Sequence, residues 1–212
     1  MAGHPVRQAL RSLLIRTVPR TRLISSLPPE QGAVALTFDD GPHPELTPRL
    51  LDLLAAHGAH ATFFVIGREA ERQPALVRRI AAEGHAVGHH SWSHSEPAST
   101  PARVLLAESR RTRELLEDLL GRPAPLFRPP HGKVTTAKLL GAWRQRNTVV
   151  LWNRDPKDFE MRNARELEAW FAKQPLKAGD VVLLHDTHPH ALGALATLLP
   201  GSPLRYVALQ AP

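Results

Sequence analysis

The stretch Ala33-Val34-Ala35-Leu36-Thr37-Phe38-Asp39-Asp40 is a near-continuous apolar run that ends in two adjacent carboxylates. Such a run predicts a strand that is buried on both faces, as in a parallel sheet. Comparable short runs recur along the chain, and segments of helical period lie between them. Strands are expected at residues 33–38, 61–66, 85–88, 126–128, 148–152, 180–184 and 206–209, and helices at residues 47–57, 74–83, 101–120, 136–146, 163–172 and 191–199. This alternation predicts an α/β fold, and both a barrel and a doubly wound sheet are compatible with it.

Polar side chains of catalytic type follow several of these expected strands. In a parallel α/β barrel the carboxyl ends of the strands share one face, and that face holds the active site. Carboxylate, imidazole and guanidinium groups at so many strand ends therefore predict an active site rather than scattered structural charges. The residues are Asp39, Asp40, His90, His94, Arg128, Asp155, Asp158, His185 and Asp186.

The stretch His90-Ser91-Trp92-Ser93-His94 predicts a metal site. Two histidines four residues apart lie on one face of a helix or helical turn, so both imidazoles can bind one ion. Imidazole suits zinc and the neighbouring transition metals. The Asp39-Asp40 pair is the best source of a third ligand, and two histidines with one aspartate leave the open positions that a catalytic metal needs. The histidine pair alone is equally compatible with surface residues, because the chain holds 12 histidines.

Composition excludes several classes of function. The 212 residues are enough for one domain with a sizeable core, and the chain holds no cysteine, which excludes disulfides, thiolate metal sites and a cysteine nucleophile. The net charge is +7 with histidine neutral, but the arginines are spread through the expected helices. Since no basic stripe is interleaved with aromatic residues, we expect no nucleic-acid partner.

The N-terminal region is expected to differ from the rest of the chain. The break at Leu27-Pro28-Pro29-Glu30 divides a basic extension, residues 1–30, from a domain over residues 31–212. The extension could form a basic amphipathic helix that lies on a membrane or packs on the domain. No transmembrane run and no clear signal peptide are visible, so a cytoplasmic location is expected by default, with peripheral membrane association or export left open.

A series of motifs resembles the polysaccharide deacetylase family, the carbohydrate esterase family 4 group with the NodB homology domain. The resemblance spans about residues 33–209. It implies a distorted (β/α) barrel with fewer than eight strands, a divalent metal, usually zinc, and hydrolysis of N-acetyl or O-acetyl groups on glycans. The motifs are Thr37-Phe38-Asp39-Asp40-Gly41-Pro42, His90-Ser91-Trp92-Ser93-His94, Arg128-Pro129-Pro130-His131-Gly132, Asp155-Pro156-Lys157-Asp158-Phe159 and Leu183-Leu184-His185.

The resemblance also implies a role for each motif residue. It implies the metal ligands Asp40, His90 and His94, the catalytic base Asp39 and the general acid His185. Arg128 would hold the base, Asp158 would orient the acid, and Leu183 would line the acetyl pocket. His131, Phe159 and His89 stand where the family usually has tyrosine, tryptophan and asparagine. His131 and Phe159 border the sugar site, and the backbone N–H of residue 131 would contribute to oxyanion stabilisation.

The expected activity is that of a metal-dependent hydrolase acting on carbon–nitrogen bonds other than peptide bonds, with an acetylated polysaccharide, peptidoglycan or chito-oligosaccharide as substrate. An O-acetyl esterase or a small-amide hydrolase on the same fold is one alternative. A carbohydrate-binding protein without activity is another. The acidic pair and His185 argue against the binding protein, because binding alone needs neither a base nor an acid.

Overall fold

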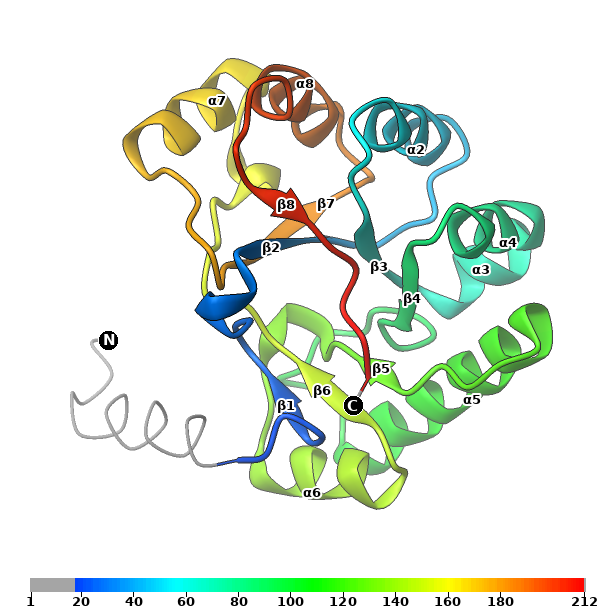
Figure 1. Cartoon of the computed structure of the whole chain (residues 1–212). Helices are drawn as coiled ribbons and strands as arrows, with labels where there is room; N and C mark the ends of the chain where they lie inside the picture. The colour runs from blue at the N-terminus through cyan, green and yellow to red at the C-terminus, as the bar shows by residue number, and fades with distance from the viewer. Residues whose placement is uncertain (1–17, 212) are drawn as a thin grey trace.

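The protein is a curled parallel sheet with helices on its outer side (Figure 1). The computed structural model describes residues 18–211. Seven strands follow one path in the spatial order β1-β6-β5-β4-β3-β2-β7, and β8 (Arg205–Tyr206) pairs with the start of β2 beside that path. This confirms a distorted (β/α) barrel with fewer than eight strands in the curled path. The strands of the path are β1 (Leu23–Ile24), β2 (Ala33–Asp39), β3 (Ala61–Val65), β4 (Ala86–His89), β5 (Leu126–Phe127), β6 (Thr148–Val150) and β7 (Val181–His185).

The helices begin and end close to the expected positions. Pro74 lies in the first turn of α4, Gly121 closes α5 in the left-handed conformation with φ 62°, and the side chain of Asn163 caps α7 by accepting from the Glu166 N–H. The helices are α2 (Leu46–Ala56), α3 (Gly67–Arg72), α4 (Pro74–Ala82), α5 (Ala102–Leu120), α6 (Thr136–Arg144), α7 (Ala164–Lys173) and α8 (Pro189–Leu198), and the short 3-10 helices are η1 (Pro29–Gln31), η2 (Pro130–Gly132) and η3 (Asp158–Glu160).

Some local expectations were wrong. The short helix α3 and the strand β1 were not predicted, because both are too short for a periodic apolar pattern to be recognised. Helix α2 begins at Leu46, so Thr47, the expected first residue of this helix, lies inside it. The Thr47 hydroxyl accepts from His43 N–H and donates to the carboxylate of Asp186. The Thr47 hydroxyl therefore supplies a donor to a buried carboxylate and does not cap the helix.

Strand β2 is the centre of the sheet, and all of its residues are buried. It pairs in parallel with β3 on one side and with β7 on the other. Val34, Leu36 and Phe38 pack in the main core cluster with residues of the helices, whereas Ala33 and Ala35 pack in the cluster of the barrel interior. Because side chains alternate along a strand, Asp39 belongs to the inward-facing set and lies at the mouth of the barrel.

The two ends of the curled sheet are joined at one bridge beyond β6. Beyond β6 the chain forms a single parallel bridge between Arg154 and Val182, and β1 pairs with the other part of the free edge of β6. β1 lies within residues 1–30, the expected basic extension. The amphipathic helix expected in that extension falls mainly outside the described residues, which begin at residue 18. Among residues 18–211, no helix is long and apolar enough to cross a membrane.

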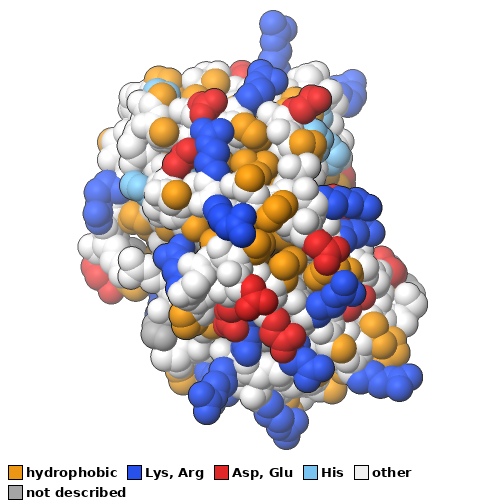
Figure 2. All heavy atoms as spheres, turned by 90° about the vertical axis from the view of Figure 1, so that its right-hand side faces the viewer, with side chains coloured by type: hydrophobic (Ala, Val, Ile, Leu, Met, Phe, Trp, Pro, Cys, Tyr) orange, Lys and Arg blue, Asp and Glu red, His pale blue; other side chains and the backbone are white. Residues whose placement is uncertain are grey.

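The surface on the side of α2, α4 and α5 carries charges of both signs. Figure 2 shows basic, acidic and apolar side chains scattered among one another over this face. Several of the charges pair at the surface, such as Arg79 with both Asp52 and Glu83. Exposed pairs of this kind contribute little to stability.

Candidate active site

The two histidines of the expected metal site lie in a loop that follows β4, not in a helical turn. Ser91 and His94 both have left-handed backbone, with φ 64° and 56°, and the Ser91 hydroxyl accepts from the His94 N–H at 3.1 Å. The two imidazole rings nevertheless lie 4.9 Å apart. Local hydrogen bonding by a serine side chain competes with helix formation, and here it produces a tight loop that turns both rings to the same side.

Glu108 of α5 holds this loop, a contact that no sequence pattern predicted. One oxygen of its carboxylate accepts from the backbone N–H groups of Trp92 and Ser93, at 3.3 and 3.2 Å, and the other accepts from the Ser93 hydroxyl at 2.7 Å. Arg111, one helical turn later, lies over the Trp92 ring at 3.3 Å. A glutamate on a charged helix is ordinarily solvated, so only the three-dimensional contacts identify its role.

The ligand set Asp40, His90 and His94 converges on one point at the mouth of the barrel. One ligand atom from each residue lies within 4.8 Å of the others. Asp40 Oδ1 is 3.4 Å from His94 Nε2 and 3.6 Å from His90 Nε2. The same oxygen is buried and has no hydrogen-bond partner among the described residues. A buried carboxylate oxygen without a partner is costly, so these residues fit a divalent cation.

The second nitrogen of His90 fixes the orientation and tautomer of the ring. Nδ1 lies 2.6 Å from the backbone carbonyl oxygen of Arg128. Because a carbonyl only accepts, Nδ1 carries the hydrogen and Nε2 presents its lone pair, as a metal ligand requires. Burial lowers the pKa of His90 to about 3, which keeps the ring neutral.

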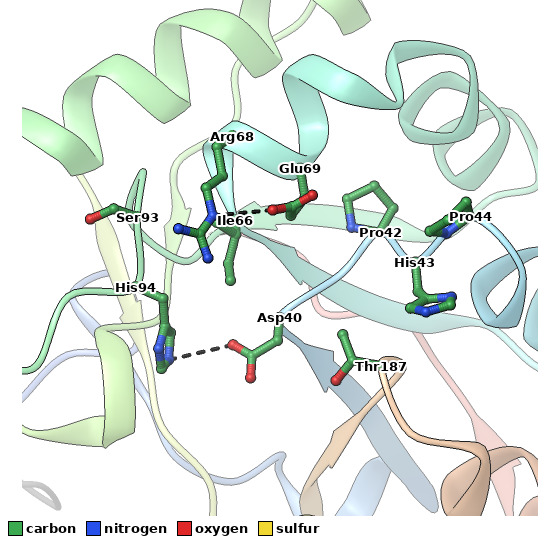
Figure 3. Close-up of a pocket in the computed structure, with 10 residues that line it drawn as sticks. All are labelled: Asp40, Pro42, His43, Pro44, Ile66, Arg68, Glu69, Ser93, His94 and Thr187. Carbon is green, nitrogen blue, oxygen red and sulfur yellow. Dashed lines mark hydrogen bonds and ion pairs between the residues drawn. The ribbon is translucent and has the colours of Figure 1, made fainter.

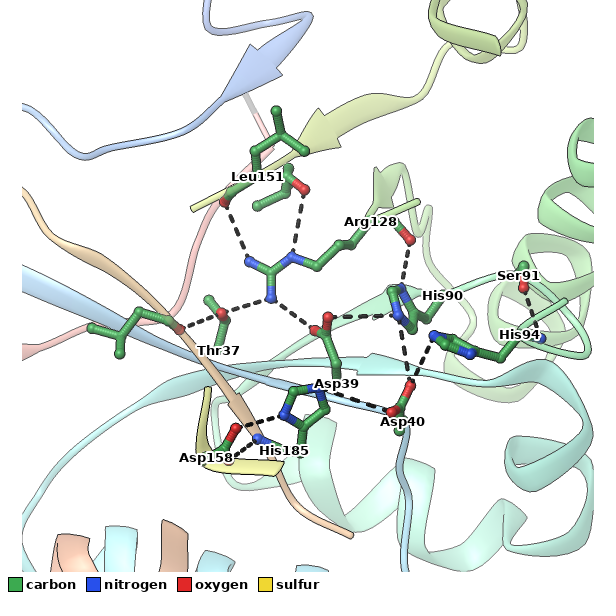
Figure 4. A network of polar contacts seen from close by, with 12 residues as sticks. Thr37, Asp39, Asp40, His90, Ser91, His94, Arg128, Leu151, Asp158 and His185 are labelled. Atoms are coloured by element: carbon green, nitrogen blue, oxygen red, sulfur yellow. Dashed lines mark hydrogen bonds and ion pairs between the residues drawn. The ribbon is translucent and has the colours of Figure 1, made fainter. Parts of the chain in front are cut away.

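Asp39 lies beside the ligand set and is held by Arg128 (Figure 4). Arg128 Nη1 donates to Asp39 Oδ1 and to Thr37 Oγ1, both at 2.7 Å, and Nη2 donates to the Leu151 carbonyl at 3.3 Å. Burial raises the pKa of the Asp39 carboxyl, and the charge and hydrogen bond of Arg128 oppose that rise. Asp39 Oδ2 is 3.5 Å from His90 Nε2, so one oxygen is held by the guanidinium and the other faces the ligand site.

His185, at the end of β7, forms a dyad with Asp158. Its Nδ1 is 2.7 Å from Asp158 Oδ1, and its backbone N–H donates to Asp158 Oδ2 at 2.8 Å. Burial by itself lowers the pKa of His185, but the hydrogen bond and charge of Asp158, with the charges of Asp39 and Asp40, outweigh it and raise the pKa to about 9. His185 Nε2 lies 3.9 Å from Asp40 Oδ2, so a protonated imidazole faces the ligand site.

A cleft of about 450 Å³ opens over these groups. Of the residues expected to contact substrate, Leu183 is a buried part of its wall, and Phe159 is half exposed with its ring edge-on to His185 at 5.2 Å. His131 has left-handed backbone, with φ 55°, and its ring lies 4.9 Å from that of His94. The cleft is also lined by residues that were not predicted as substrate contacts, namely Trp152, Lys133, Lys157, Asp155 and His188.

Asp155 is one of the strand-end residues expected at the active site, and Trp152, the last residue of the expected strand over residues 148–152, could have been found in the same way. Lys133, Lys157 and His188 come from loops whose course no periodic pattern predicts. Asp186, also at a strand end, does not line this cleft. It is buried, accepts from Thr47, and has its pKa raised to about 7 by burial.

A family model described as polysaccharide deacetylase matches residues 26–147. The peptidoglycan-N-acetylglucosamine deacetylase of Bacillus cereus is 35% identical over 179 residues, which are 82% of this chain and 83% of that protein. A chitooligosaccharide deacetylase of Bradyrhizobium is 38% identical and is matched over 74% of this chain and 72% of that protein. The chain covers 33% of the peptidoglycan-N-acetylmuramic acid deacetylase PdaC of Bacillus subtilis, at 35% identity.

Solved structures agree with these matches. The crystal structure of the Bc1960 peptidoglycan N-acetylglucosamine deacetylase has a TM-score of 0.79 and 33% identity, and the alignment covers 89% of this chain and 91% of that one. A family 4 pseudoenzyme from Bacillus anthracis also has a TM-score of 0.79, at 21% identity and covering 92% of this chain and 69% of that one. Because that fold occurs without activity, catalysis has to be inferred from the side chains in the cleft.

Proposed function

The chain belongs to the polysaccharide deacetylase family, and we propose that it is a metal-dependent hydrolase that removes acetyl groups from N-acetylated glycans. The observation that carries the proposal is the position of two polar pairs around the ligand set. Asp39, paired with Arg128, and His185, paired with Asp158, both face the site formed by Asp40, His90 and His94. Amide hydrolysis needs a base for water and an acid for the leaving amine, and these pairs supply both.

Asp40, His90 and His94 would hold one divalent cation. Two imidazoles and one carboxylate with open positions are a donor set typical of catalytic zinc. A cation bound there would lower the pKa of a water molecule and polarise the acetyl carbonyl. The hydrogen bond from His90 Nδ1 to the Arg128 carbonyl would keep Nε2 directed at it.

Asp39 is proposed to accept the proton of the attacking water. Arg128 holds Asp39 Oδ1, which leaves Oδ2 on the side of the ligand set. His185 is proposed to protonate the departing nitrogen from Nε2, because Asp158 holds Nδ1 and maintains the charge of the ring. A carboxylate held by a guanidinium and an imidazole held by a carboxylate, placed on one ligand site, are the pattern expected of an acid–base pair.

The cleft supports a sugar substrate. Leu183 offers an apolar wall for the acetyl methyl group, and Phe159 and Trp152 offer ring faces or edges of the kind that pack against sugars. The backbone N–H of His131 is proposed to donate to the oxyanion that forms during attack. This donor would not depend on the side chain, which would allow histidine to occupy the position.

Acetate release tests the proposal. The protein would be stripped with a chelator, titrated with zinc, and assayed with N-acetylglucosamine oligomers, peptidoglycan, acetylated xylan and a small N-acetyl amide. We expect zinc-dependent release from the N-acetylated glycans. Release from acetylated xylan or the small amide alone would favour the esterase or amidase alternative. Glycan binding without any release by the zinc-loaded protein would favour a carbohydrate-binding protein.

A further inference from the structure

A second hollow lies next to the cleft. It has a volume of about 390 Å³, and Asp40 and His94 line both the hollow and the cleft. Figure 3 shows that the side chain of Arg68 extends from α3 into this hollow, towards Asp40 and His94. We propose that Arg68 binds a carboxylate on the substrate, and that the enzyme therefore prefers acidic N-acetylated glycans over neutral ones. The proposal rests on the proposed function and names its substrate class.

Hydrogen bonds hold the backbone of Arg68 against the loop that carries His90 and His94. The Gly67 N–H donates to the Ser91 carbonyl at 2.9 Å, and the Arg68 N–H donates to the Trp92 carbonyl at 3.2 Å. A side chain at position 67 would lie 2.5 Å from atoms of both Trp92 and Thr112, so only glycine permits this approach. The start of α3 thus has a defined position relative to His94, and only the Arg68 side chain can adjust to a ligand.

Two nitrogens of the Arg68 guanidinium are available to a ligand. Its Nε pairs with Glu69 Oε1 at 3.1 Å, and Arg72 Nη1 pairs with the same oxygen at 3.0 Å. One carboxylate therefore serves two guanidinium groups, which leaves a net positive charge. Within residues 18–211, Nη1 and Nη2 of Arg68 make no hydrogen bond, and the side chain is 49% exposed.

The other groups of the hollow do not neutralise this charge. Asp40 is assigned to the cation, and His43, whose Nδ1 accepts from the N–H groups of Glu45 and Leu46, offers no negative charge. Pro42 and Ile66 supply apolar surface. An arginine with its two terminal nitrogens free matches the two oxygens of a carboxylate, and a sugar ring beside it would contact the apolar surface. A uronic acid or an ether-linked lactyl group on the glycan carries such a carboxylate.

The test compares matched substrates with matched variants. The substrates are a neutral N-acetylglucosamine tetramer, a tetramer in which alternate sugars carry a lactyl carboxylate, and the methyl ester of the latter. The test variant is Arg68→Gln, and the control is Arg72→Gln. In the wild type, Arg72 pairs with Glu69 as Arg68 does, but it does not line the hollow. We expect Arg68→Gln to lower kcat/KM for the carboxylate substrate about tenfold, mostly through KM, because a charge-assisted hydrogen bond at a half-exposed position is lost.

For the neutral tetramer, Arg68→Gln should change kcat/KM by less than about twofold, and Arg72→Gln should do so for every substrate. Esterification should reproduce the tenfold loss in the wild-type enzyme and abolish the effect of Arg68→Gln. Equal effects of Arg68→Gln on the neutral and acidic tetramers, or no effect of esterification, would overturn the inference while leaving deacetylation intact.

A binding measurement separates this inference from the proposed function. In the zinc-loaded Asp39→Asn background, the dissociation constants for the same oligosaccharides would be compared with and without Arg68→Gln. If the zinc-loaded wild-type enzyme released acetate from none of the substrates, the proposed function would fail. A carboxylate-dependent difference in affinity would still support Arg68 as the anion-binding residue, and equal affinities would overturn it.

Discussion

Arg128 contacts His90 through its backbone carbonyl, which lies 2.6 Å from His90 Nδ1, while its guanidinium holds Asp39 at 2.7 Å. A single buried residue thus orients a proposed metal ligand with its main chain and the proposed base with its side chain. The two roles can be separated by mutation, because a substitution changes the guanidinium and leaves the carbonyl in place. Arg128, which follows β5, therefore sets the position of Asp39 relative to His90, and the exposed loops do not.

The ligand assignment predicts which variants lose the metal. His90→Ala, His94→Ala and Asp40→Ala should each lower zinc affinity by at least about 100-fold, since loss of even an outer-shell partner costs roughly 10- to 100-fold. Zinc content after dialysis, measured by mass spectrometry, checks this. His188→Ala is the control, because His188 lines the cleft but is not in the ligand set. Full zinc content in all three ligand variants would place the metal elsewhere.

The base assignment predicts a variant that keeps its metal and loses its activity. Asp39→Asn should bind zinc normally, since Asp39 is assigned to the base and not to the cation, while kcat for an N-acetylated oligomer falls by about 10² to 10⁴. The amide oxygen introduced by this substitution could still accept a hydrogen bond from Arg128, so the fold should be retained. Turnover within about threefold of the wild type would remove Asp39 from the mechanism.

The acid assignment predicts a dependence on the leaving group. His185→Ala should slow hydrolysis of an N-acetyl amide far more than that of an acetyl ester with a good leaving group, because such a group needs little protonation to depart. The ratio of the two rate constants is the measurement. Asp158→Asn should show the same selectivity in a weaker form, because it removes the charge that holds the His185 ring protonated. Equal slowing of amide and ester by His185→Ala would contradict an acid role.

Much of the site could be predicted because its residues lie where buried strands end. Asp39, Arg128 and His185 follow apolar runs, and a parallel sheet gathers such ends on one face. The convergence of His90 and His94 was expected, but the helical turn was wrong, because the left-handed backbone of Ser91 depends on a local side-chain hydrogen bond. The sequence spacing of His90 and His94 cannot distinguish a helical turn from such a loop, because both bring the two rings together.

Other contacts could not be predicted because they join segments far apart in sequence without a periodic signal. Glu108 contacts the loop of His90 and His94 from α5, a helix whose polar pattern is equally consistent with a solvated face. β1 is two residues long, and its pairing with β6 is set by the open edge of the barrel. A short edge strand leaves almost no hydrophobic pattern, so only the tertiary fold defines it.

A buried histidine away from the site predicts how stability depends on pH. His85 is 3% exposed, its Nδ1 accepts from the Ala61 N–H at 3.1 Å, and burial, with the neighbouring His60, lowers its pKa to about 4. As the pH falls below about 6.5, the unfolded chain takes up the proton first, so this contribution to stability is present above 6.5 and is lost towards pH 4. The loss should be on the order of 3 kcal/mol.

Denaturant unfolding at a series of pH values checks this contribution. His85→Asn retains an acceptor for the Ala61 N–H but cannot titrate, so its free energy of unfolding should fall less between pH 6.5 and 4 than that of the wild type. His57→Asn, at an exposed position, should behave as the wild type does. A pH profile of His85→Asn parallel to the wild-type profile would mean that His85 is not the group responsible.

The last prediction concerns His131, the residue whose backbone N–H is proposed to donate to the oxyanion. If the backbone N–H of this residue stabilises the oxyanion, the side chain is dispensable for the chemical step. His131→Tyr and His131→Ala should keep kcat within about tenfold of the wild type, with larger changes confined to KM. His131→Gly should do the same, since glycine keeps the N–H and readily adopts the φ of 55° found here.

His131→Pro should lose far more, on the order of 10² to 10³ in kcat, because proline has no N–H to donate. Its ring also fixes φ near roughly −65°, so the loop must shift and the variant's fold and zinc content have to be measured before its rate is interpreted. The glycine variant supplies the comparison, because it removes the same imidazole without removing the donor. If His131→Gly and His131→Ala were as inactive as a folded, zinc-loaded His131→Pro, the imidazole would be the catalytic group and the backbone assignment would be wrong.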